Sequence, residues 1–156
     1  MAAAGEGGYG IAPVAGGSRV RGDMQAALSE QTLPALLADT VARFGERPAA
    51  LFREQGIRWT WREFADEVDA FAAGLVALGL EPGERIGIWS PNNAEWAITQ
   101  FATAKAGLVL VNINPAYRLS ELDYALNKVG CKALVTATAF KTSDYAAMLE
   151  QIRPKV

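Results

Sequence analysis

Three short apolar segments recur about 24 residues apart in the second half of the sequence, and each gap between them has the pattern of one helix. The segments begin near residues 85, 108 and 133. Parallel strands need a long crossover, which is usually a helix and is almost always right-handed. We therefore predict an α/β fold with a partial parallel sheet, built from β-α-β units and flanked by helices.

The middle segment, residues 108–113, is an apolar run bounded by Asn114 and Pro115. Such a run is typical of a strand that is buried on both faces of a parallel sheet. The segment at 85–90 is too short to indicate which of its faces is buried. A further strand is expected at 133–136. Earlier in the chain, Gly56 separates two short strand patterns, 49–53 and 57–60, which predict a hairpin.

Local capping signals indicate where helices begin. Thr32 precedes the first helical pattern, and Thr60 with Glu63 fits a capping box, in which each side chain satisfies a free backbone amide. Asn92 with Glu95 has the same spacing. Helices are expected at about 32–44, 61–78, 92–106, 119–129 and 142–152.

Apolar residues at spacings of three and four give each helix a predicted buried face. On the first helix this face consists of Leu33, Leu36, Leu37, Val41 and Phe44. On the second it consists of Phe64, Val68, Phe71, Leu75 and Leu78.

Charge and rare residues exclude several classes of function. The 156 residues include 15 Lys and Arg against 17 Asp and Glu, which gives a net charge of −2 and no basic stripe for a nucleic acid. One cysteine and no histidine leave neither an internal disulfide nor a zinc cluster. The sequence has no run of about 18 apolar residues, which a transmembrane helix would need. We expect a cytoplasmic protein without a metal site in this chain and without a nucleic-acid partner.

The N-terminal region differs in composition from the rest. Residues 1–31 are rich in Gly and Ala, and residues 1–17 have neither the early positive charge nor the apolar segment of a secretory signal. We predict a disordered leader over 1–31 and one folded domain over 32–156.

Several segments, in this order, resemble the N-terminal portion of the adenylate-forming acyl-CoA synthetases. They are residues 60–64, 79–92, 104–107 and 112–118, and the resemblance covers about residues 30–156. Residues 127–135 and 140–142 are most similar to the medium-chain branch, that of acyl-CoA synthetase family member 2 and its bacterial relatives. On this resemblance, 32–156 is a truncated N-terminal subdomain of an AMP-binding domain.

The resemblance implies a two-step ligase. A fatty acid carboxylate attacks the α-phosphate of ATP, accompanied by Mg²⁺, to form an acyl-adenylate and pyrophosphate, and the thiol of coenzyme A then displaces AMP. The phosphate loop, the adenine and ribose contacts, the hinge and the C-terminal lysine of such enzymes are expected after Val156, so no catalytic residue is assigned here. The chain is expected to be an inactive fragment whose partner is the rest of the enzyme.

Two alternatives to a medium-chain ligase remain open. One is an aryl-CoA ligase or a luciferase-type member of the same superfamily, which differs in substrate. The other is a non-catalytic α/β binding module that shares the scaffold.

Three residues are candidates for ligand contacts. Asn112 and Asn114 flank the end of the predicted buried strand, where ligands of open α/β sheets bind, so both are candidate substrate contacts. Turn chemistry before Pro115 explains them as well. The resemblance implies that the coenzyme A nucleotide passes near Lys141, which makes this lysine a candidate contact for its phosphate. The alternative is a solvated lysine that opens the last helix.

Overall fold

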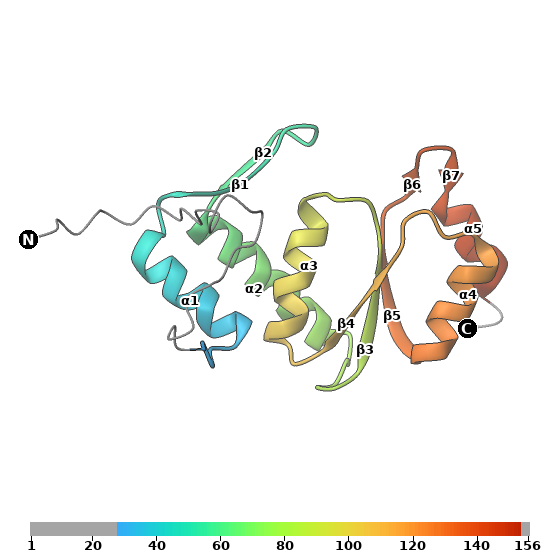
Figure 1. The fold of residues 1–156 in the computed structure, drawn as a ribbon, viewed down its shortest axis with the longest axis horizontal. Coiled ribbons are helices and arrows are strands. Elements are labelled where there is room, and N and C mark those ends of the chain that lie inside the picture. Colours follow the sequence, from blue (N-terminus) through green and yellow to red (C-terminus); the bar gives the residue numbers. More distant parts are fainter. Residues whose placement is uncertain (1–27, 154–156) are drawn as a thin grey trace, which may run out of the picture. The chain divides into compact units, whose positions relative to one another are not determined.

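Five helices alternate with single strands or short groups of strands in the described part of the computed structural model, residues 28–153 (Figure 1). The predicted leader, 1–31, lies almost entirely outside the described residues. The elements below belong to the unit Gln31–Val156. Among the described residues, no helix combines the length and the apolar character that crossing a membrane requires.

A three-stranded parallel sheet forms the centre of this unit. Its strands are β3 (Arg85–Trp89), β4 (Val109–Ile113) and β5 (Cys131–Thr136), in the order β4-β3-β5. Helix α3 (Ala94–Lys105) connects β3 to β4, and α4 (Leu119–Val129) connects β4 to β5. The predicted α/β class with β-α-β units is confirmed.

The strand that is buried on both faces is β3 and not β4. Ile86, Ile88 and Trp89 of β3 are almost wholly buried, whereas Val109 of β4 is 49% exposed. The prediction for 108–113 was therefore wrong. The first crossover leads from β3 to β4 on one side, and the second leads from β4 back past β3 to β5 on the other side, so that β4 and β5 flank β3. The apolar run at 108–113 does not indicate the order of the strands in the sheet, because that order depends on which strands pair.

Each face of the sheet has its own apolar core. Ile86 points to the face covered by α1 (Leu33–Phe44), α2 (Trp61–Ala77) and α3, and Trp89 belongs to the core under α4 and α5 (Tyr145–Ile152). This division follows from the alternation of side chains along a strand. Gly87 points to the second face, where an added Cβ would lie 2.9 Å from Leu134 Cδ1.

The predicted starts of the first two helices are confirmed. The Thr32 hydroxyl accepts a hydrogen bond from the Ala35 amide at 3.3 Å. The Thr60 amide donates to Glu63 Oε2 at 2.7 Å, which completes the capping box. The hairpin is also present, with β1 (Pro48–Phe52) antiparallel to β2 (Ile57–Thr60).

The predicted buried faces are only partly correct. Leu37 is buried on α1, but Leu33 and Leu36 in the first turn are exposed. Leu78 is 77% exposed because it is the C-cap residue, beyond the last turn of α2, and the small Ala72 is buried instead. Periodicity identifies the face of a helix, but it does not show how much of that face the neighbouring elements cover.

Two helices begin later than predicted. Asn93, and not Asn92, is the N-cap of α3, and its Oδ1 accepts from the Trp96 amide at 2.9 Å. Helix α5 begins at Tyr145 and not at Thr142. A short hairpin of β6 (Ala139–Phe140) and β7 (Ser143–Asp144) precedes it. Strands of two residues have no periodic signal, so the sequence did not reveal this hairpin.

Candidate functional site

The candidate site lies at the carboxyl ends of the parallel strands. In open α/β sheets, ligands bind where successive crossovers leave in opposite directions, because the loops there diverge and leave a crevice. In this sheet that point is the end of β3, since β4 and β5 lie on its two sides. The segments that surround it are 90–93 after β3, 114–118 after β4 and 137–144 after β5.

Hydrogen bonds fix the loop after β3. The Ser90 hydroxyl is buried, donates to the Pro91 carbonyl at 3.0 Å and accepts from Asn93 Nδ2 at 3.0 Å. The Trp89 carbonyl accepts from the Thr136 hydroxyl at 3.0 Å, which joins the ends of β3 and β5. This part of the edge is therefore held by bonds between neighbouring strands.

A cavity of about 310 Å³ opens beside this loop, and its lining mixes apolar and polar side chains. Its polar lining consists of Gln55, Ser90, Asn93, Glu95, Thr136 and Thr138. Gln55 comes from the distant β1–β2 turn, and its Oε1 accepts from the Ala94 amide at 2.8 Å while its Nε2 donates to Glu95 at 2.8 Å. The lining offers hydroxyls, amides and one carboxylate but no cation, so charge does not favour a phosphate here.

Asn112 and Asn114 lie at the other flank of the edge. Asn112 is exposed and lines a groove of about 490 Å³ together with Tyr117. Asn114 Oδ1 accepts from the Ala116 amide at 2.9 Å, which is the turn bond that the alternative interpretation predicted. The Asn114 carbonyl accepts from Trp89 Nε1 at 3.1 Å. A role of either asparagine in substrate binding stays a prediction.

Lys141 lies in the tight turn between β6 and β7 and does not open a helix, so that alternative was wrong in its placement. Phe140 pairs with Ser143. The backbone of Lys141 has a φ of +53°, a left-handed conformation that residues other than glycine rarely adopt. The lysine is exposed and borders an open hollow of about 410 Å³ with Thr138, Thr142 and Asp144. The contact with coenzyme A stays a prediction.

Sequence reasoning missed the side chains that connect these loops. The Tyr145 hydroxyl donates to the Pro115 carbonyl, and Arg118 Nη1 donates to the Ser143 hydroxyl at 2.6 Å. Burial raises the pKa of the Tyr145 phenol, so the hydroxyl keeps its proton at neutral pH. No local pattern marks these pairs, because their partners are 25 and 30 residues apart.

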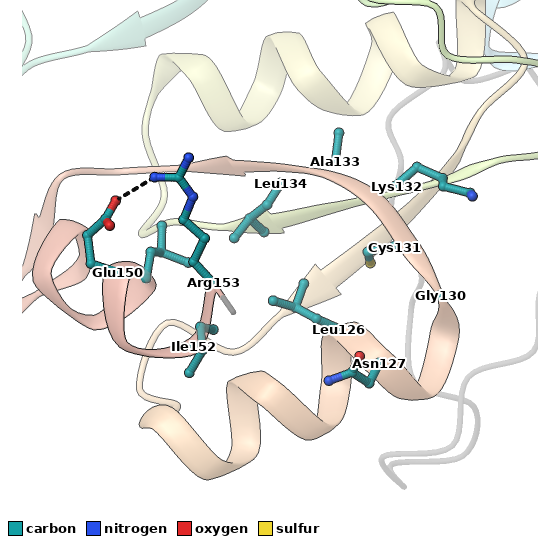
Figure 2. A pocket seen from close by; sticks show the side chains of 11 residues that line it. Leu126, Asn127, Gly130, Cys131, Lys132, Ala133, Leu134, Glu150, Ile152 and Arg153 are labelled. Carbon is teal, nitrogen blue, oxygen red and sulfur yellow. Dashed lines mark ion pairs between the residues drawn. The ribbon is translucent and has the colours of Figure 1, made fainter. Parts of the chain in front are cut away.

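A separate cavity of about 370 Å³ lies between α4, β5 and α5 (Figure 2). Figure 2 shows Leu126, Leu134 and Ile152 around it and the ion pair of Glu150 with Arg153, at 3.5 Å. Cys131 also lines it, and burial raises the pKa of the thiol although the charge of Arg85 opposes this. Cys131 begins β5, so this cavity lies away from the carboxyl ends of the strands.

The described part of the chain contains no cluster of side chains suited to bind a metal ion. Within residues 28–153, no three His, Cys, Asp or Glu side chains come together in a way that could hold a metal ion. Besides neutral hydrogen-bonding groups, the three edge segments carry the charged side chains of Arg118, Lys141 and Asp144.

Comparison with known proteins gives the family of the chain. The AMP-binding enzyme family matches residues 37–156. The chain belongs to the AMP-binding enzyme family. The resemblance noted in the sequence is thereby confirmed.

Curated relatives specify the branch of this family. The medium-chain acyl-CoA ligase ACSF2, mitochondrial, of Danio rerio is 47% identical over 139 residues, which are 89% of this chain and 23% of that protein. The human protein of the same name is 44% identical over 92% of this chain and 23% of its own length. The chain thus spans about a quarter of the length of the curated relatives it matches.

Solved structures share the fold. The inhibitor-bound N-terminal domain of FACL13 from Mycobacterium tuberculosis superimposes with a TM-score of 0.73 over 80% of this chain and 30% of that one. The two sequences are 22% identical, so this likeness bears on the fold alone. The predicted α/β fold class agrees with it.

Proposed function

We propose that the chain is the N-terminal part of an ATP-dependent medium-chain fatty acid CoA ligase that acts through an acyl-adenylate. The observation that carries this proposal is the 47% identity with a medium-chain acyl-CoA ligase over 89% of the chain. In the proposed reaction, a fatty acid carboxylate attacks the α-phosphate of ATP and pyrophosphate leaves. The thiol of coenzyme A then attacks the acyl carbon, and AMP leaves.

The described residues supply one edge of the proposed site. Asn112 and Asn114 are the proposed contacts for the fatty acid, and Lys141 is the proposed contact for a coenzyme A phosphate. ATP and Mg²⁺ need further groups, because the cavity beside Ser90 has no cation in its lining and residues 28–153 form no metal cluster. We infer that the rest of the enzyme chain completes their site, so the present 156 residues alone are inactive.

The cytoplasmic location expected from the sequence stays a prediction. The names of the Danio rerio and human relatives assign those two proteins to mitochondria. Fractionation of cells that produce the complete protein, with cytosolic and mitochondrial marker enzymes, would decide between the two compartments.

The proposed activity is tested on the complete protein. Exchange of labelled pyrophosphate into ATP is measured with octanoate, with benzoate and without an acid, and thioester formation is measured after coenzyme A is added. We expect exchange that depends on octanoate and then octanoyl-CoA with AMP. Preference for benzoate would indicate an aryl-CoA ligase, light emission with a luciferin a luciferase-type enzyme, and no exchange with any acid a binding module.

The inactivity of residues 1–156 needs its own measurement. The isolated chain is assayed beside the complete protein at equal molar concentration. We expect no exchange above the control without enzyme. Exchange by the isolated chain would show that the first half-reaction needs no residue after Val156.

A further inference from the structure

The loops after β4 and β5 are joined by side chains across the end of β3. The two strands lie on opposite sides of β3, so their loops do not follow neighbouring strands. Even so, the Tyr145 hydroxyl at the start of α5 donates to the Pro115 carbonyl. Arg118 Nη1 donates to the Ser143 hydroxyl at 2.6 Å. Two separate hydrogen bonds therefore connect loop 114–118 with the segment 139–145.

The buried side chain of Trp89 contacts both loop 114–118 and Tyr145, which follows the 139–144 hairpin. Its indole N–H donates to the Asn114 carbonyl at 3.1 Å, and its ring stacks on Tyr145 with the ring centroids 3.5 Å apart. Both rings are fully buried. Tyr145 thus has a fixed orientation, with its hydroxyl aimed at the backbone of the neighbouring loop.

The backbone pairing between β6 and β7 is too short to stabilise this hairpin by itself. Each of its strands has two residues, and a hairpin of this length is unstable without other contacts. Lys141 in its turn adopts a left-handed conformation, which persists only where the surroundings impose it. The hairpin therefore depends on its contacts with the rest of the fold, and the bonds of Arg118 and Tyr145 are among them.

We propose that Arg118 and Tyr145 are positioning residues that fix the 139–144 hairpin against loop 114–118, so that the two loops form one rigid edge of the site. The catalytic consequence rests on the proposed function, because it assumes that Lys141 contacts coenzyme A. The mechanical connection rests on the hydrogen bonds alone. Loss of either bond should loosen both loops, including the loop that was not mutated.

Hydrogen exchange of the complete protein tests the mechanical connection. Ser143→Ala removes the acceptor of Arg118 without a change of charge, and Tyr145→Phe keeps the stacked ring but removes the hydroxyl. Each variant should speed amide exchange in residues 114–118 by roughly two- to tenfold, as expected for the loss of one hydrogen bond. Thr142→Ala, in the same hairpin, and Tyr124→Phe, on α4, are matched controls that should leave this segment unchanged.

Two exchange results would overturn the proposal. In one, Ser143→Ala speeds exchange only in the hairpin. In the other, the control variants speed exchange in 114–118 as much as the test variants. Ser143 lies in a surface hairpin, so its variant is expected to fold even if Tyr145→Phe does not.

Kinetics test the positioning role. In Ser143→Ala, we expect the coenzyme A KM to rise roughly threefold or more, while pyrophosphate exchange at saturating octanoate stays at the parent rate. Saturating octanoate offsets a weaker fatty acid contact at Asn114, which lies in the loosened loop 114–118. A general folding defect would lower both half-reactions together. An unchanged coenzyme A KM in a variant with loosened loops would overturn the positioning role. If the parent protein itself shows no exchange with any acid, the proposed function fails, and the hydrogen-exchange result still decides the connection between the loops.

Discussion

The indole ring of Trp89 lies flat against the phenol ring of Tyr145, with an interplanar angle of 12° and 3.5 Å between the ring centroids. Trp89 ends the central strand, and Tyr145 begins the last described helix. Both rings also form hydrogen bonds to the loop after β4, through Asn114 and Pro115. This pair therefore joins three segments that are far apart in the sequence.

Truncation of Trp89 should be costly. Trp89→Ala removes a fully buried ring, its stacking contact with Tyr145 and its hydrogen bond to the Asn114 carbonyl. We expect a loss of about 3–5 kcal/mol in the free energy of unfolding. Tyr124→Ala on the exposed face of α4 should change it by less than about 0.5 kcal/mol. Urea unfolding of the complete protein measures both. Similar losses in the two variants would contradict the assigned packing.

Two leucines on α2 test the corrected buried face. Leu75 is 3% exposed and Leu78 is 77% exposed, although both belong to the same predicted stripe. Leu75→Ala should cost about 2–5 kcal/mol, because it leaves a cavity in the core. Leu78→Ala should cost less than about 0.5 kcal/mol. Thermal and urea unfolding would show the difference, and equal costs would mean that Leu78 is covered in the complete protein.

Gln55 connects the β1–β2 turn to the start of α3. Its side chain satisfies the Ala94 amide, one of the amides that a helix start leaves without a partner. Gln55→Ala should therefore lower the free energy of unfolding by about 1 kcal/mol. Glu54→Ala, in the same turn, is the control and should have little effect. A neutral result for Gln55→Ala would show that water replaces the bond at no cost.

Glu63 should make the start of α2 sensitive to acid. Hydrogen bonds from the backbone and side chain of Thr60 lower the pKa of this carboxyl below its ordinary value of 4.5. A carboxyl whose pKa is lower in the folded state stabilises that state above pH 4.5, and this contribution is lost as the pH falls through the folded-state pKa. The parent protein should therefore lose stability below pH 4.5.

Glu63→Gln separates this contribution from other acid effects. Glutamine keeps an acceptor for the Thr60 amide but does not titrate, so the variant should lose less stability between pH 6.5 and pH 3.5. Glu67→Gln, exposed on the same helix, controls for the change of charge. Melting temperatures across this range provide the measurement. The same acid loss in Glu63→Gln and in the parent would rule out the capping box as its source.

Lys141→Ala tests the proposed coenzyme A contact. A charge-assisted hydrogen bond contributes about 1.5–3 kcal/mol, so the coenzyme A KM of the complete enzyme should rise roughly 10- to 100-fold. Pyrophosphate exchange should be unaffected, because it precedes the arrival of the thiol. Lys128→Ala, an exposed lysine on α4, is the control for lost charge. An unchanged KM in Lys141→Ala would leave this residue as a solvated lysine in a turn.

The candidate site was only partly predictable. Asn112, Asn114 and Lys141 were found from strand ends and from the resemblance, and the turn bond of Asn114 agrees with its local sequence. Arg118, Ser143 and Tyr145 were not found as connecting residues. Their bonds depend on the distance between two loops, and the sequence of either loop alone does not specify that distance.

The sequence by itself determined most of the helices and strands and the parallel direction of the three sheet strands. Capping residues such as Thr60 bond to residues three positions away in the sequence. A crossover that contains one helix connects two strands that run parallel in the same sheet. The tertiary structure alone decided that β3 is central, that Leu78 is exposed, and that a hairpin separates β5 from α5. The physical reason is the distance along the sequence over which each kind of contact acts. Periodicity and caps are contacts between near neighbours in the chain, whereas strand order, burial and loop tethers arise from residues that meet only when the chain has folded.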